Sequence, residues 1–323
     1  MEDRTQGRRR GPRTGPWAGE AGVFLAIAFT AAGLLGALQP ATGIPPEVLQ
    51  LTQLGPAFAV AGVALLWPAR IGDRLAGALP ALPALPALPV LPVPPARRGV
   101  RAGSTRKRAA RTAERTPPGA PGRAPAARRA AALLLTPFAV IALCAGGVLG
   151  TLGALPGTTS PALGHPLLLV VAAQFLGACA EEIGWRCHLQ PLLRTRFGPL
   201  TASVLVGVAW GLWHVPVLTR QPAHAAGFLL GAVALSVILG LALDGMRSNR
   251  LLLAGAFHTL VNLGMLLVTD EASADATPML VFGAACAAAA LPWIAHAHAR
   301  TRRASPEPET TDTITAAPAH RTR

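Results

Sequence analysis

Two adjacent glutamates interrupt an apolar stretch of this chain, in the sequence Cys179-Ala-Glu181-Glu182-Ile-Gly-Trp-Arg186. Glu182 and Arg186 are four residues apart, so on a helix they stack on one face in the favourable order for an ion pair. Glu181 points about 100° away around the helix and has no local cation. An unpaired carboxylate in a low-dielectric setting is a candidate general base. The alternative is that both acids brace neighbouring helices through Arg186, and the residues alone leave both interpretations open.

Two further apolar stretches contain histidine. In the first, Trp210-Gly-Leu-Trp-His214, Pro216 follows two residues later and should kink the helix and free a carbonyl, while Trp210 could pack against the imidazole. In the second, His258 and Asn262 share a helix face. Such a pair can bind water, hold a metal or polarise a carbonyl. It can equally make a single hydrogen bond between helices, which is common in membranes.

The composition indicates a membrane protein. Of the 323 residues, 51% are hydrophobic and 14% are charged, and the mean hydropathy is +0.43. Soluble domains carry about 25% charged residues, so the apolar residues here cannot all be hidden in one soluble core. An ionisable side chain within a membrane helix costs roughly 2.5–3.5 kcal/mol and persists when it is paired or functional. Together the carboxylates, histidines and amide could activate a water and stabilise an oxyanion, the two requirements of peptide hydrolysis.

The hydropathy pattern predicts an all-α, polytopic membrane protein with about eight transmembrane helices. The apolar stretches cover approximately 22–38, 51–67, 130–153, 165–190, 199–219, 224–245, 251–268 and 278–296. Lys and Arg collect in every second connecting segment, which predicts that both termini are cytoplasmic. Residues 1–20 are then a basic cytoplasmic tail, 21–67 form two N-terminal transmembrane helices, 130–299 form a membrane domain with six helices, and 300–323 form a disordered tail.

Residues 68–129 are predicted to be a disordered, Pro-rich and basic cytoplasmic linker. Ala-Leu-Pro repeats fill 78–89, and eleven Lys or Arg but one acid occupy 97–129. The basic part is what a solvated cytoplasmic loop should contain, and contact with anionic lipid is its functional alternative. We expect the net charge of +14 to serve the membrane surface rather than nucleic acid.

The motifs Glu-Glu-x-x-x-Arg, aromatic-x-x-x-His and His-x-x-x-Asn, in this order on nearby helices, resemble the CAAX-protease/bacteriocin-processing (CPBP) family. This family includes the type 2 CAAX prenyl endopeptidases and the bacterial Abi-type proteins. The resemblance covers roughly residues 130–268. Trp210 stands where the family usually has Phe, and Cys187-His188 stands where many relatives have Gly and an aromatic residue.

The resemblance implies a multi-pass protease of the cell membrane that cleaves a membrane-associated, prenylated or peptide substrate. Glu181 would activate the attacking water, His214 would position that water, and His258 with Asn262 would stabilise the oxyanion. Glu182, Arg186 and Trp210 would be structural or orienting. We expect no metal cofactor; if zinc is used instead, the predicted ligands are Glu181, His214 and His258.

Two other functional classes remain open from the sequence. A non-catalytic membrane scaffold or bacteriocin-immunity protein could keep the fold without cleaving a substrate. A proton-coupled transporter would also place Glu and His in membrane helices, but it would favour related repeats in two halves, and we find no such repeat.

Overall fold

The structure of this chain is a computed structural model that describes residues 16–80, 123–159, 164–270 and 273–304. Every regular element in these ranges is helical, and six segments are long and apolar enough to cross a membrane. They are α1 (Pro16–Thr42), α5 (Arg123–Leu152), α6 (Leu167–Gly184) with its continuation through the π-helix η4 (Trp185–Leu189) and α7 (Gln190–Arg194), α10 (Pro222–Leu243), α11 (Arg250–Val268) and α12 (Thr277–Ala304).

Two shorter apolar segments complete the bundle. The first joins η1 (Leu51–Leu54) to α2 (Gly55–Leu66), and the second is α8 (Pro199–Trp213), which is followed by the single turn α9 (Val215–Leu218). With the six longer helices they account for the eight predicted stretches. The predicted all-α, polytopic membrane fold is therefore confirmed.

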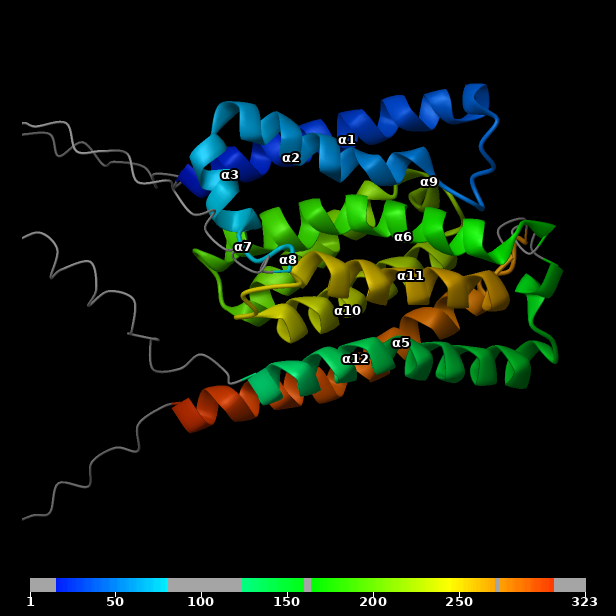
Figure 1. Ribbon diagram of the computed structural model, residues 1–323. Helices are drawn as coiled ribbons and strands as arrows, with labels where there is room; N and C mark the ends of the chain where they lie inside the picture. Colours follow the sequence, from blue (N-terminus) through cyan, green and yellow to red (C-terminus); the bar gives the residue numbers. More distant parts are fainter. Residues whose placement is uncertain (1–15, 81–122, 160–163, 271–272, 305–323) are drawn as a thin grey trace, which may run out of the picture.

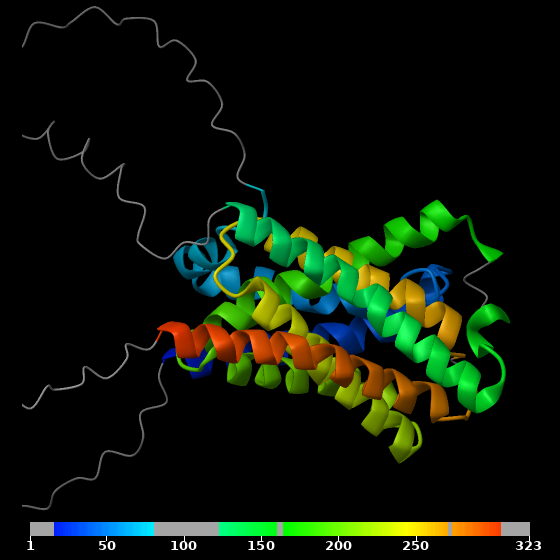
Figure 2. The ribbon, with the colours of Figure 1, turned by 90° about the horizontal axis from the view of Figure 1, so that it is seen from below.

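The helices form layers (Figures 1 and 2). α1 and α2 pack together and cover α6; α6 packs on α11, and α11 on α5; α12 lies against α5 and α10. α10 also packs on α8 and is the most buried of the six long helices. The start of α1 and the end of α12 lie at the same end of the bundle (Figure 1). That arrangement fits an even number of crossings, while the cytoplasmic side of this end stays a prediction.

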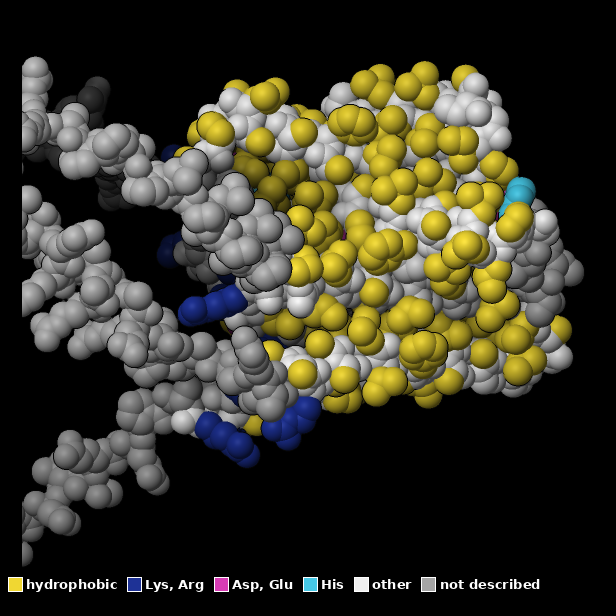
Figure 3. Space-filling view, in the orientation of Figure 1, with side chains coloured by type: hydrophobic (Ala, Val, Ile, Leu, Met, Phe, Trp, Pro, Cys, Tyr) yellow, Lys and Arg dark blue, Asp and Glu magenta, His cyan; other side chains and the backbone are white. Residues whose placement is uncertain are grey.

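The face of the bundle seen in Figure 3 is apolar over its length. Leu65, Leu167 and Leu168 are 87%, 71% and 81% exposed. Side chains of this size gain free energy only in an apolar medium, so the exposed surface is the one that lipid would cover. Lys and Arg gather near the end of the bundle where α1 starts (Figure 3).

The predicted boundaries of the linker, residues 68 and 129, are both wrong. Helix α3 (Pro68–Leu75) lies inside it, and α5 starts at Arg123 rather than near residue 130. Pro68 is at the first helical position, where its ring is pre-organised for a helix, and Ile71 gives α3 one buried contact. Likewise α12 continues to Ala304, beyond the predicted start of the tail. Residues 81–122 and 305–323, with most of the Ala-Leu-Pro repeats, lie outside the described residues.

An ion-pair cluster fixes α3 to α1. Glu20 on α1 is 2% exposed and accepts hydrogen bonds from the guanidinium of Arg74, with one N–O distance of 3.0 Å. Arg70 lies 3.7 Å from the same carboxylate. Because α3 buries little apolar surface, these charged contacts hold it against the bundle.

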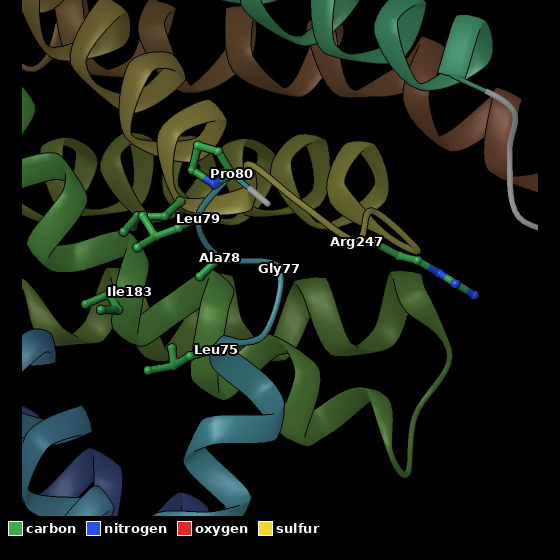
Figure 4. Close-up of a pocket in the computed structure, with 8 residues that line it drawn as sticks. Leu75, Gly77, Ala78, Leu79, Pro80, Ile183 and Arg247 are labelled. Carbon is green, nitrogen blue, oxygen red and sulfur yellow. The ribbon is translucent and has the colours of Figure 1, made fainter. Parts of the chain in front are cut away.

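The segment after α3 caps the start of α11. The carbonyl oxygens of residues 77, 78 and 79 accept hydrogen bonds from the N–H groups of Arg250 (3.3 Å), Leu251 (2.9 Å) and Asn249 (3.4 Å). The first N–H groups of a helix have no partner within it, so this segment supplies the missing acceptors. We call residues 76–80 the capping segment. Between it and Ile183 lies a mostly apolar cavity of about 280 Å³, and the Arg247 side chain points away from it (Figure 4).

Gly77 is required by the geometry of the capping segment. Its φ is +84°, a conformation that L side chains rarely adopt, and a Cβ there would lie 2.2 Å from the carbonyl oxygen of Arg247. Gly72, one helical turn and a half earlier in α3, has open space around the same position.

We therefore expect Gly77→Ala to destabilise the protein by at least about 1–3 kcal/mol, the cost of holding a non-glycine residue in this conformation. Gly72→Ala, the matched control, should be neutral or stabilising by up to about 1 kcal/mol because alanine favours the helix. Thermal unfolding in detergent, followed by circular dichroism, measures both. Equal unfolding temperatures for the two variants would contradict the capping role.

Candidate active site

The candidate site lies between α6 and α11, which run in opposite directions and approach closely. The approach depends on Gly255 of α11, because a Cβ at this position would lie 2.4 Å from the Sγ of Cys179 on α6. Two polar contacts cross the resulting interface: one joins Glu182 to His258, and the other joins Gln174 to Asn262.

Glu182 is the centre of a buried charge network. Its Oε2 lies 3.0 Å from Nε of Arg186, which is the ion pair predicted from their spacing. Its Oε1 accepts a hydrogen bond of 2.9 Å from Nδ1 of His258. Glu182 is fully buried, and Arg186 and His258 are 2% and 5% exposed. Because a carboxylate only accepts, Nδ1 of His258 carries the proton, and Nε2 is the ring nitrogen left to face the site.

Arg186 lies in the π-helical turn η4, a rare conformation that is frequent at functional sites. Its guanidinium lies 5.3 Å from the centre of the Trp210 ring, within cation–π distance. Its Nη1 donates a hydrogen bond of 3.0 Å to Ser236 Oγ, which in turn donates to the carbonyl of Ser203 (2.6 Å). Arg186 thus connects the network on α6 and α11 to α8 and α10. The two serines were not predicted from the sequence.

Glu181 is 1% exposed and is not without a partner, although it has no local cation. Nε1 of Trp210 donates a hydrogen bond of 2.7 Å to its Oε2. The sequence predicted that Trp210 packs against His214 and has a structural or orienting role, but not that it donates this hydrogen bond. The Trp210 ring also lies edge-on to His258 (5.2 Å between centroids) and to His214 (6.0 Å). Trp210 therefore brings the three candidate catalytic side chains into one region.

His214 lies at a break in the chain rather than within a helix. Helix α8 ends at Trp213, and α9 starts at Val215, so the apolar stretch 199–219 is not one continuous helix. The N–H of His214 bonds to the carbonyl of Gly211, which leaves the Trp210 carbonyl free to accept a 2.9 Å hydrogen bond from Nδ1 of His214. The prediction that a carbonyl is freed near Pro216 placed its cause elsewhere: the Trp210 carbonyl is free because α8 ends at Trp213, whereas Pro216 would free that of Leu212. The Trp210 carbonyl holds the imidazole so that Nε2 is the nitrogen available for chemistry.

Asn262 faces Gln174 of α6, whose Oε1 accepts a hydrogen bond of 3.0 Å from Nδ2 of Asn262. Gln174 was not predicted from the sequence. The signal that could have identified it is its position: a polar residue within an apolar run, two helical turns before Glu181 and on the same face.

Within the described ranges, no group of three or more His, Cys, Asp or Glu side chains has an arrangement that could hold a metal ion. The alternative zinc set of Glu181, His214 and His258 stays a prediction. Two of its members already use one ligand atom, Nδ1, in hydrogen bonds to the protein.

Comparison with known proteins identifies the class. Residues 163–264, which include every candidate site residue, match the sequence model of the family described as type II CAAX prenyl endopeptidase Rce1-like. The predicted resemblance to the CAAX-protease/bacteriocin-processing (CPBP) family is confirmed over these residues, and the six apolar helices make the chain a multi-pass membrane protein.

Two curated relatives illustrate the range of the family. The CAAX prenyl protease 2 of Methanococcus maripaludis is 30% identical over 132 residues, which cover 36% of this chain and 46% of that protein. The lysostaphin resistance protein A of Staphylococcus aureus strain MRSA252 is 24% identical over 135 residues, which cover 42% of this chain and 32% of that protein. The chain thus spans less than half the length of either relative.

The charge network gives a stability prediction. Arg186→Met should destabilise the protein by about 3–5 kcal/mol, because removing one partner of a buried ion pair leaves the other charge uncompensated. In the double variant E182Q/R186M no uncompensated charge remains, and much of the loss should be recovered. Unfolding free energies of the double variant and of the single variants Arg186→Met and Glu182→Gln, measured in detergent, test this. A double variant that is as unstable as the sum of its two single variants would contradict the pairing.

Proposed function

We propose that this protein is an intramembrane endopeptidase in which Glu181 is the general base that activates the attacking water. The observation that carries the proposal is the environment of Glu181. Its Oε2 is fixed by Trp210, whereas Oε1 has no hydrogen-bond partner among the described residues. A buried carboxylate with one oxygen anchored and the other open, near two histidines, suits a base that must hold a water in one orientation.

The remaining side chains can be given roles in peptide hydrolysis. Nε2 of His214 would accept a hydrogen bond from the same water and fix its direction of attack. Glu181 takes a proton as the water oxygen bonds to the carbonyl carbon, and it returns that proton to the amine when the C–N bond breaks. The second N–H of the Asn262 amide would donate to the oxyanion. Nε2 of His258, whose Nδ1–H is held by Glu182, would do the same when it carries a proton.

The proposed substrate is a peptide segment of a membrane-associated or prenylated protein. The name of the archaeal relative, a CAAX prenyl protease, supports this class, and the burial of the site in an apolar bundle supports a substrate that arrives within the membrane. The name of the staphylococcal relative, a lysostaphin resistance protein, is the observation behind a second candidate, a non-catalytic membrane scaffold or immunity protein.

Cleavage of a peptide library by the purified protein in liposomes tests the proposal. Glu181→Gln keeps the shape and the hydrogen bond from Trp210 but removes the base, so kcat should fall about 10²–10⁴-fold, the usual contribution of a general base. Glu47→Gln, a glutamate in the segment between α1 and η1, is the matched control and should keep wild-type kcat. Full activity of Glu181→Gln would refute the proposed mechanism.

The same assay separates the metal-free reaction from the zinc alternative. We expect a strong zinc chelator to leave wild-type cleavage unchanged. Loss of cleavage on chelation, followed by recovery on adding zinc, would instead assign Glu181, His214 and His258 as metal ligands. Cleavage of no peptide by wild-type protein would favour the scaffold interpretation.

A further inference from the structure

Gln174 connects the candidate site to one end of the bundle. The capping segment lies at the other end. The Gln174 side chain is 7% exposed and lies on α6, between α11 and the segment that links α1 to η1. Nε2 of Gln174 donates to the carbonyl oxygens of Glu47 and Val48, each at 3.3 Å, while its Oε1 accepts from Nδ2 of Asn262 at 3.0 Å.

The two carbonyls determine the orientation of both amides. A carbonyl oxygen can only accept a hydrogen bond, so the NH₂ group of Gln174 must face Glu47 and Val48. Its oxygen must then face α11. That oxygen can only accept, so Asn262 must present its own NH₂ group rather than its oxygen. One N–H of Asn262 donates to Gln174. Because the amide group is planar, this hydrogen bond also fixes the direction in which the other N–H of the same NH₂ group points.

We infer that Gln174 is a positioning residue for the reaction: it holds the Asn262 amide so that its second N–H is available as the oxyanion donor. The inference rests on the proposed function, because it gives Asn262 that role. Without Gln174 the Asn262 amide can rotate by half a turn and present its oxygen, which would repel an oxyanion. Oxyanion donors are effective when they are already oriented, so this loss should appear in kcat more than in KM.

The competing explanation is that Gln174 only anchors the segment between α1 and η1. The chain contains a matched control for this. Nε2 of Gln39 donates to the carbonyls of Ile44 (2.8 Å) and Leu49 (3.1 Å), and its Oε1 accepts from the N–H of Leu51 (2.6 Å). Gln39 therefore fixes the same segment through the same type of side chain, but its hydrogen bonds do not involve Asn262.

The kinetic test compares Gln174→Ala, Gln39→Ala, Asn262→Ala and the double variant Q174A/N262A on one cleaved peptide. We expect Gln174→Ala to lower kcat on the order of tenfold with little change in KM, as for the loss of one oriented hydrogen bond. Gln39→Ala should lower the unfolding temperature but keep kcat. The double variant should be no slower than Asn262→Ala. Equal kcat for Gln174→Ala and Gln39→Ala, or losses that multiply in the double variant, would overturn the inference.

A second readout does not depend on activity. The sequence contains two asparagines, Asn249 and Asn262, so protein labelled with ¹⁵N-asparagine gives two side-chain NH₂ signals. Gln174→Ala should move the Asn262 signals and leave those of Asn249 in place, whereas Gln39→Ala should move neither. Unmoved Asn262 signals in Gln174→Ala would overturn the inference. Asn262→Ala with full activity would instead refute the oxyanion role in the proposed function, even where the NMR shift shows that Gln174 holds the amide.

Discussion

The buried carboxylate of Glu182 is the constraint on which the site depends. In an apolar bundle its charge must be matched locally, and it is matched on both sides, by Arg186 at 3.0 Å and by His258 at 2.9 Å. The first contact fixes a guanidinium within η4, and the second fixes the rotation of α11 relative to α6. The network defines which ring nitrogen of His258 faces the site. It also places Arg186 beside the Trp210 ring.

Trp210 links the Glu182 network to the other two side chains that it holds in the site, Glu181 and His214. Its ring lies between Arg186 and two histidines, its indole N–H holds Glu181, and its backbone carbonyl holds His214. That carbonyl is available only because α8 ends at Trp213. The break in the helix and the tryptophan therefore act together: one frees the acceptor that orients the imidazole, and the other supplies the donor that orients the carboxylate.

The sequence predicted features that depend on contacts along one helix. The Glu182–Arg186 pair follows from its spacing. Contacts between helices were missed: Gln174 with Asn262, Arg186 with Ser236, and Trp210 with Glu181. They depend on the rotation and register of each helix against its neighbours. Hydropathy does not encode either, because a membrane helix is apolar on its lipid-facing side as well as on its buried side.

Helix α3 was missed for a different reason: it has eight residues, and charged contacts with Glu20 rather than apolar burial hold it in place. The roles of the site residues in catalysis came from the family resemblance, and the geometry adds the partners through which those roles could be exerted.

The length of α8 has a consequence for the surrounding bilayer. Its 15 residues span about 22 Å, compared with about 30 Å for a typical hydrocarbon core. Leu205, Val208 and Leu212 are 40–43% exposed along it, so this short helix forms part of the lipid-facing wall. Local thinning of the membrane is one way in which such a hydrophobic mismatch is relieved. Because His214 sits at the end of α8, thinner lipid there brings the aqueous phase closer to the imidazole, and acyl-chain length becomes a variable that acts on the site.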